Sequence, residues 1–300
     1  MIIKTEIFKT GLLSMLILLV SFFKSYAQEA ISIFGRVYAD PQNGPGYFEP
    51  LSNVLNDGMS MHWQSHRPQS RLRFGVSVIA ARSFIPEKYK SFEASYTSLE
   101  NGQMLAVNAP TVFGENEALI VTEANGYSHV FPGGFNYNFI TIAVPQLTVE
   151  GFLNSAASLR FITVDIDDEV GNFTTFGLSV EHHFAPYLEL ESTILSASAG
   201  YETIEAGDIM DARHTFLQLT GGGYGEFFHY YGSLGIQLFQ QSVRYEDPFK
   251  GFAVQEIDIP ASNRFLLKLG AGFQWSVLSA GVEISPLAPL SVGVQVGLKI

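Results

Sequence analysis

Residues 290–300 read LSVGVQVGLKI, and every second residue from Leu290 to Ile300 is apolar. The residues between them are serine, glycine, glutamine or lysine. Side chains of a strand point alternately to its two faces, so this segment predicts a strand with apolar side chains on one face and small or polar side chains on the other. The second face carries few charges, whereas the outward face of a water-soluble sandwich would be rich in them. This pattern favours a strand that faces lipid on one side.

The same alternation recurs toward the N-terminus. Residues 265–277, FLLKLGAGFQWSV, alternate in the same way, and the phase changes after Ser276, which indicates a tight turn. Similar segments lie at 228–238, 213–221, 195–201, 176–180, 157–165, 139–149 and 71–82. Most are close to the roughly 9–11 residues that cross an outer membrane as a tilted strand. The sequence therefore predicts an all-β protein, a transmembrane antiparallel up-and-down β-barrel of about 10–14 strands with a best estimate of about 12.

The first residues predict export. Gly11 to Phe23 is almost wholly apolar, and Ser25 and Ala27 supply small residues before a cleavage site. A transmembrane helix needs roughly 20 apolar residues, which is more than this run contains. We therefore expect residues 1–27 to be a cleaved signal peptide and residues 28–300 to be a single barrel domain in the bacterial outer membrane.

Composition excludes several classes of function. The formal charge of the chain is −12, and clustered cations for binding phosphate are missing, so no nucleic acid is expected as a partner. The chain has no cysteine, which excludes disulfides, thiolate chemistry and cysteine-ligated metals. Hydrophobic residues make up 47% of the chain, yet only one apolar run approaches the length of a helix. Helical membrane spans are therefore not expected.

The lengths of the connections predict which end of the barrel faces the cell surface. Barrels of this kind have short periplasmic turns, longer external loops and a periplasmic C-terminus. Counting back from Ile300 predicts external connections at 285–289, 244–263, 205–212 and 165–172. The same count predicts periplasmic turns near Ser276, at 222–226 and at 185–189.

The segment ahead of the barrel strands contains a predicted helix. We expect a strand at 32–38, a loop at 39–50 and a short helix around 47–66, because apolar residues from Phe48 to His62 recur at helical spacing. The helix can fold into the lumen as a plug or lie across the periplasmic rim. Its apolar side chains either pack on the inner wall or line an apolar pocket. The predicted ligand-binding residues are Leu51, Val54, Leu55 and Met59.

Other residue clusters point only weakly to chemistry. His62 and His66 are four residues apart, but two histidines are too few for a metal site, and none is expected. Ser179, Glu181 and His183 share one face of a strand, as residues of any polar lumen wall would. The acidic run at 165–169 departs from the spacing of a calcium-binding loop. The sequence therefore predicts no catalytic residues and no cofactor.

An ordered set of short motifs resembles a known group of proteins. The chain resembles an uncharacterised family of outer-membrane β-barrels from Bacteroidetes-type bacteria, distantly similar to the long-chain fatty-acid transporter porins. The resemblance implies a lumen plugged by the N-terminal segment and passage of a hydrophobic small molecule. The porins carry Asn-Pro-Ala near the mature N-terminus, where this chain has Asp40-Pro41-Gln42, and they are longer. The motifs that carry the resemblance lie at 50–58 with His66, 84–86 with Phe92, 109–114, 132–134, 145–146, 177–182 and 292–298.

Three functional hypotheses follow. The first is permeation or transport of a hydrophobic small molecule, and the second is a structural or adhesive barrel without a passage. The third, an embedded lipid-modifying enzyme built around His183, is the least favoured, and no enzyme activity is expected. The expected partners are outer-membrane lipids, a hydrophobic small molecule, and the barrel assembly machinery through residues Leu290 to Ile300.

Overall fold

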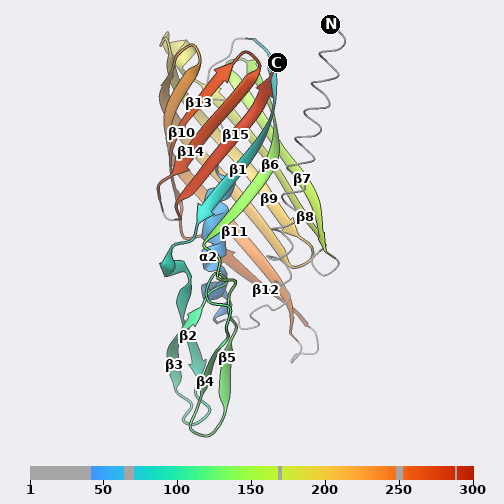
Figure 1. Ribbon diagram of the computed structural model, residues 1–300, viewed down its shortest axis with the longest axis vertical. Coiled ribbons are helices and arrows are strands. Elements are labelled where there is room, and N and C mark those ends of the chain that lie inside the picture. Colours follow the sequence, from blue (N-terminus) through green and yellow to red (C-terminus); the bar gives the residue numbers. More distant parts are fainter. Residues whose placement is uncertain (1–41, 64–70, 168–170, 248–252, 288) are drawn as a thin grey trace.

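The computed structural model describes residues 42–63, 71–167, 171–247, 253–287 and 289–300. Within them, ten strands form a closed antiparallel barrel and an eleventh, β12 (Ala253–Pro260), extends the sheet at one end (Figure 1). Pairing of β1 with β15 closes the barrel. The wall strands, in order around the barrel, are β1 (Arg73–Phe84), β6 (Phe139–Phe152), β7 (Ser155–Asp167), β8 (Gly171–His183), β9 (Thr193–Ala206), β10 (Met210–Tyr224), β11 (Phe228–Asp247), β13 (Phe265–Trp275), β14 (Leu278–Ser285) and β15 (Ser291–Lys299).

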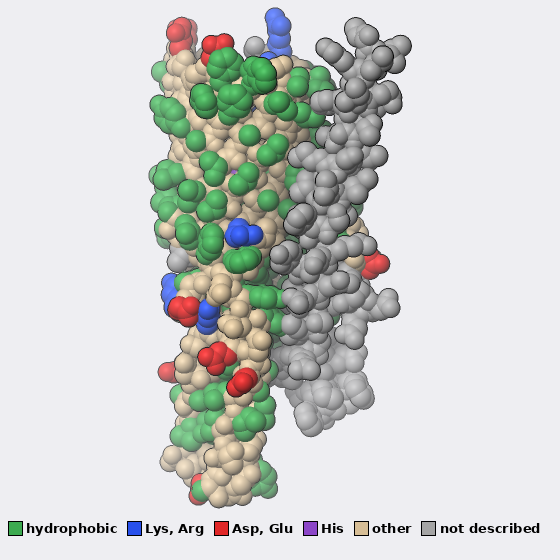
Figure 2. Space-filling model, in the orientation of Figure 1, with side chains coloured by type: hydrophobic (Ala, Val, Ile, Leu, Met, Phe, Trp, Pro, Cys, Tyr) green, Lys and Arg blue, Asp and Glu red, His purple; other side chains and the backbone are tan. Residues whose placement is uncertain are grey.

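The wall shows the two faces that the alternation predicted. Leu234, Ile236 and Leu269 are 65%, 52% and 56% exposed on the outside, whereas Gln237 is buried inside. Figure 2 shows hydrophobic side chains spread over the outer wall, with charged groups gathered toward its two ends. A wall that is apolar outside and small or polar inside suits a bilayer. The predicted fold class is confirmed.

The connections fall at the two ends as predicted, with one correction. The turns after β6, β8, β10 and β13 lie at the end that holds the C-terminus, and Ser276 forms the β13–β14 turn with φ 55°. The predicted external loop at 244–263 is wrong in form, because it is mostly strand. The final residues of β11 pair with β12 from Gln240↔Pro260 to Asp247↔Ala253 and extend the sheet away from the C-terminal end.

A protrusion of two hairpins, residues 85–138, lies between β1 and β6. The best estimate of about 12 strands, which was based on chain length, was too high because these residues add no strand to the wall. The protrusion contains η1 (Glu87–Tyr89), β2 (Ser91–Thr97), β3 (Met104–Pro110), β4 (Leu119–Thr122) and β5 (Ser128–Phe131). β2 pairs only with β3 in its sheet, and β4 only with β5, so neither hairpin joins the barrel wall. Figure 1 shows them beyond the end of the barrel that is opposite the C-terminus.

Glu123 joins the two hairpins of the protrusion. Its carboxylate accepts hydrogen bonds from the backbone N–H groups of Leu99 and Glu100 at 3.0 Å, and it lies 2.7 Å from the His129 ring. Burial opposes ionisation of this carboxyl, but the hydrogen bonds from His129, Leu99, Ser98 and Glu100 outweigh it and lower the pKa of Glu123 to about 2. Glu123 is therefore ionised at neutral pH and accepts the hydrogen bonds that join the two hairpins.

The N-terminal helix is α2 (Gly44–Met59), which begins earlier and ends earlier than the expected 47–66. The expected loop at 39–50 is wrong from Gly44 onward. Pro45 lies in the first turn of the helix, which accepts proline because a backbone N–H would have no partner there. The predicted signal peptide, the strand at 32–38 and His66 lie outside the described residues. Among the described residues, no helix has the length and apolarity needed to cross a bilayer.

Candidate functional site

Helix α2 lies inside the barrel, in the half opposite the C-terminus (Figure 1). It contacts β1, β6, β11, β12 and β15, and all but three of its residues are buried. The plug alternative is therefore confirmed, and the alternative of a helix on the periplasmic rim is wrong. The helix fills the lumen at the end that carries the protrusion.

The apolar face of α2 packs on the inner wall. The four predicted ligand-binding residues, Leu51, Val54, Leu55 and Met59, are between 0% and 7% exposed and belong to one hydrophobic cluster. We call this the plug cluster. Its members outside α2 include Ile204 of β9 and Phe239 of β11 in the wall, Ile259 of β12, and Val112 and Phe113 of the protrusion. The structure thus brings all four residues together, while their contact with a ligand stays a prediction.

The polar face of α2 is bonded to β11 and to residues 262–263. Asp57 accepts hydrogen bonds of 2.8 Å from the side-chain amides of Gln237 and Asn263. Asn53 accepts from the backbone N–H of Ser262 at 2.8 Å, and the Ser52 hydroxyl lies 3.2 Å from the Gln241 side chain. These contacts orient the helix, so that its apolar side chains face the plug cluster.

Two cations of the wall hold the residues that follow α2. Arg160 of β7 donates to the backbone carbonyl of Met59 at 3.0 Å and also to that of Met61. Lys268 of β13 donates to the carbonyl of Ser60. The last carbonyls of a helix have no partner within it and carry partial negative charge, so cations stabilise them.

Two carboxylates balance these cations. Glu202 of β9 lies 3.4 Å from Arg160, and Glu283 of β14 lies 3.7 Å from Lys268. Glu283 also accepts hydrogen bonds from the His62 backbone N–H at 2.9 Å and from the Tyr231 hydroxyl at 2.7 Å. We call Arg160, Lys268, Glu202 and Glu283 the latch. All four are buried, so removal of any one of them would leave a buried charge without its partner and destabilise the fold.

Glycines of the wall make room for the end of the plug. The Trp63 ring lies under the Arg160 guanidinium at 3.6 Å, and a Cβ on Gly177 would come within 2.7 Å of that ring. A Cβ on Gly293 would come within 2.7 Å of the His62 ring. The alternating glycines that predicted a small inner face thus have a steric role, because the plug occupies their space.

The wall is incompletely paired between β6 and β7. The two strands pair from Phe152↔Ser155 to Gln146↔Arg160, and no backbone pairing joins residues 139–145 to residues 161–167 in the described structure. Each segment stays paired on its other side, to β1 and β8. We call this interval the seam; at ~3.3 Å per residue it is roughly 20 Å long. It begins at Pro145, which has no N–H to offer to a ladder.

The inner lining beside the seam is apolar. Ile140 and Ile142 of β6 and Phe173 of β8 pack against the plug cluster. Outside, Phe161 of β7 is exposed, and Thr163 and Asp165 follow it on the same face. The seam therefore starts within the apolar belt of the wall and extends into its polar edge.

The structure places the histidines of the sequence hypotheses on both faces of the wall. His183 and Glu181 face the lumen with Ser179, as predicted; Glu181 accepts from Ser196 at 2.7 Å and lies 3.7 Å from His183. In the described part of the chain, no group of three or more His, Asp or Glu side chains is placed to hold a metal ion. His182 faces outward, as the alternation of the strand predicts, and its Nδ1 lies 2.9 Å from the Ser155 hydroxyl, a contact that the sequence did not predict.

The comparison with protein families covers nearly the whole chain, because residues 7–298 match one family model. The chain belongs to the family of unknown function DUF6588. No curated protein matches it. This family assignment agrees with the expected family of barrels without an assigned role, and nothing found connects it to the fatty-acid transporter porins.

Several solved structures match the chain at very low identity. They include the FrpB iron transporter of Neisseria meningitidis, with 7% identity, TM-score 0.23, and coverage of 60% of this chain and 40% of that one. The Ail attachment invasion locus protein of Yersinia pestis has 11% identity, TM-score 0.24 and coverage of 77% and 99%. The transport unit of the Escherichia coli autotransporter AIDA-I has 9% identity, TM-score 0.28 and coverage of 87% and 98%.

Proposed function

We propose that this protein is an outer-membrane barrel that admits a hydrophobic small molecule past its N-terminal plug. The observation that carries the proposal is the arrangement of three features: a plug helix with an apolar face, a buried latch of charges at its end, and a seam in the wall beside it. A barrel with only a structural role needs none of the three.

The latch supports a plug that moves. Buried ion pairs add little net stability compared with apolar side chains of the same size, because each charge loses its hydration. Their geometry is strict, so a small displacement of Met59 to Trp63 breaks several contacts together. The latch therefore gives two distinct states, a held plug and a released plug.

The apolar lining supports a hydrophobic cargo. When the plug shifts, Leu51, Val54, Leu55 and Met59 and the wall members of the plug cluster line the space that opens. Ile140, Ile142 and Phe173 continue this lining to the seam. For an apolar molecule at the seam, sideways entry into the bilayer is favourable in free energy, because the molecule leaves water and does not cross the polar half of the lumen.

We expect the purified protein to carry an apolar molecule in addition to membrane lipid, and Leu55→Asn to release it. Asparagine nearly matches leucine in shape but brings a polar amide into the plug cluster, which disfavours an apolar ligand there. The measurement is solvent extraction and mass analysis of the detergent-purified protein. In parallel, uptake of the apolar dye N-phenyl-1-naphthylamine is followed in cells that lack the native gene.

Leu234→Asn is the matched control, since it makes the same change on the outer wall. It should leave both the bound molecule and dye uptake unchanged. If wild type and Leu55→Asn carry the same molecules, and dye enters at the same rate with or without the protein, transport is ruled out and the structural hypothesis remains.

A second candidate function is adhesion, and the protrusion favours it. Several large apolar side chains of its hairpins are about 60% exposed: Leu99, Met104, Ile120, Tyr127 and Val130. They lie beyond the lipid-facing wall, so the bilayer does not account for their exposure. Exposed apolar groups gathered at one end mark contact surfaces in many proteins. Leu99→Ser/Ile120→Ser/Val130→Ser should abolish surface adhesion if this is the role. It should leave dye uptake intact, because none of the three residues belongs to the plug cluster.

A further inference from the structure

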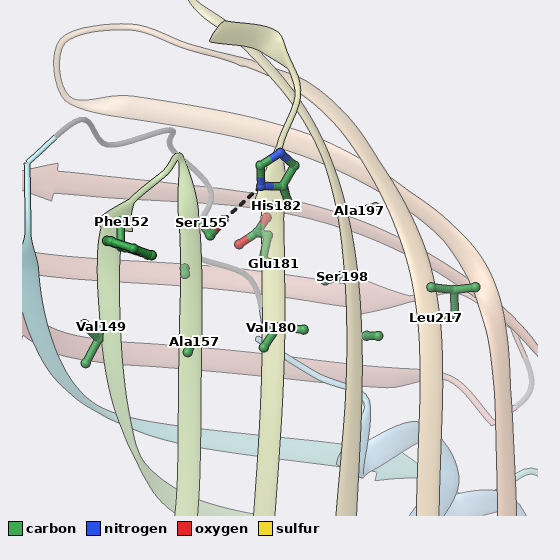
Figure 3. A pocket seen from close by; sticks show the side chains of 12 residues that line it. Val149, Phe152, Ser155, Ala157, Val180, Glu181, His182, Ala197, Ser198 and Leu217 are labelled. Carbon is green, nitrogen blue, oxygen red and sulfur yellow. Dashed lines mark hydrogen bonds between the residues drawn. The ribbon is translucent and has the colours of Figure 1, made fainter. Parts of the chain in front are cut away.

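A recess lies on the outer wall of the barrel near the C-terminal end, with a volume of about 480 Å³ (Figure 3). Outward positions of neighbouring strands carry small side chains here: Ala157 of β7 and Ala197 and Ala199 of β9. Larger side chains surround them, among them Phe152 and Leu217. Pairing of Ala157 with Val180, Val180 with Ala199 and Ala199 with Leu217 sets these positions side by side across four strands.

A polar pair lies at the edge of the recess nearest the turns. Figure 3 shows Ser155 and His182 facing each other from neighbouring strands, with 2.9 Å between Oγ and Nδ1. The one proton of the serine hydroxyl has two acceptors in reach, Nδ1 at 2.9 Å and the Leu153 carbonyl at 3.2 Å. Donation along the shorter contact, to Nδ1, leaves the proton of the neutral ring on Nε2. The rings of Phe184 and Tyr187 lie 5.1 and 5.5 Å from the His182 ring and fix its orientation.

The depth of this pair matches the boundary between headgroups and tails. Phe152, Phe184 and Tyr187 are exposed beside it, and aromatic side chains gather at that boundary in membrane proteins. Ala197 pairs with His182 at this level, whereas Ala157 and Ala199 lie two residues farther along their strands, toward the hydrocarbon. The recess therefore presents a hydrogen-bond donor at headgroup level and an apolar hollow at tail level.

We propose that the recess binds one glycerophospholipid of the surrounding membrane, with an acyl chain over the alanines and an ester or phosphate oxygen bonded to Nε2 of His182. A hollow in hydrocarbon is filled by lipid, because empty space forfeits dispersion contacts. The fixed donor distinguishes this position from the rest of the wall. No lysine or arginine lines the recess, and Glu181 faces the lumen, so a zwitterionic headgroup fits. The proposal rests on the membrane location and is independent of transport.

The test counts the lipids that remain on the barrel. The full chain is reconstituted in nanodiscs of phosphatidylethanolamine, transferred to mild detergent and measured by native mass spectrometry. The wild type should retain one lipid per barrel. Ala157→Leu/Ala199→Leu fills the recess and should lose it. The control Ala271→Leu/Ala280→Leu adds the same volume to exposed alanines of β13 and β14 and should retain it.

A second variant tests the polar anchor. His182→Phe keeps an aromatic ring against Tyr187 but removes the donor, so retention should fall by about 5- to 10-fold, the effect of one hydrogen bond. Heat-modifiable gel mobility confirms that each variant is folded. The proposal is overturned if the filled double variant, or His182→Phe, retains phosphatidylethanolamine as the wild type does.

Discussion

Replacing Arg160 with methionine is expected to lower the free energy of unfolding by roughly 3–5 kcal/mol, because it leaves a buried carboxylate without its partner. Glu202 loses its cation, and the carbonyls of Met59 and Met61 lose the hydrogen bonds from Arg160, although the Met59 carbonyl keeps that from the Trp63 indole N–H at 2.8 Å. The methionine side chain fills most of the space that Arg160 occupies over the Trp63 ring, so cavity formation contributes little. Urea unfolding in detergent micelles, followed by tryptophan fluorescence, measures the change.

The double variant Arg160→Met/Glu202→Met is the control for this effect. It removes both charges, so most of the lost stability should return, although the carbonyls of Met59 and Met61 still lack the hydrogen bonds from Arg160. A single variant that costs less than about 1 kcal/mol, the value of a solvated surface pair, would mean that the latch is not a buried network.

Leu234→Arg is expected to lower the free energy of unfolding by roughly 2–4 kcal/mol in a bilayer, since a charge near the middle of the lipid-facing wall loses its hydration. Leu234 lies on β11 between the aromatic residues Phe228 and Tyr230 on one side and Gln240 on the other. The measurement is reversible unfolding in lipid vesicles.

Gln240→Arg provides the matched control, because Gln240 is an outward residue of the same strand nearer its polar end. Near the interface the same substitution costs only about 0–1 kcal/mol. Equal losses at Leu234 and Gln240 would show that the wall is packed against protein, as in a soluble sandwich.

The barrel could be predicted from the sequence because one physical rule acts along each strand. Residues 290–300 and 265–277 alternate without interruption, so both their faces and the turn at Ser276 followed directly. The hairpins at 91–131 were not predicted. β4 and β5 have four residues each, which is too short for an alternating pattern to stand out from the turns around them.

The four apolar plug residues were found from their helical spacing, whereas the latch was missed. Arg160, Glu202, Lys268 and Glu283 are far apart in the sequence, and only the closed barrel brings them to one level of the lumen. One signal was present: each is a charged residue at an inward position of a strand that is otherwise small or apolar on that face. The outward Ser155–His182 contact gave no such signal, because the two residues lie on different strands and only the pairing of β7 with β8 brings them together.

The central claim, that the plug moves to admit an apolar molecule, is tested most directly by locking the plug to the wall. Ser52→Cys/Gln241→Cys places thiols on α2 and β11 at side chains that now lie 3.2 Å apart, and the chain has no other cysteine. A short cross-linker that reacts with a thiol at each end, and that reduction cleaves, joins the two cysteines. Thr220→Cys/Ser233→Cys, whose hydroxyls lie 2.8 Å apart, joins two wall strands and leaves the plug free.

The readout is uptake of N-phenyl-1-naphthylamine by cells that carry each variant in place of the native protein. We expect the plug cross-link to reduce uptake to the level of cells without the protein, and reduction of the linker to restore it fully. The wall cross-link should have no effect in either state. Uptake that is the same with the plug locked and released would contradict the account.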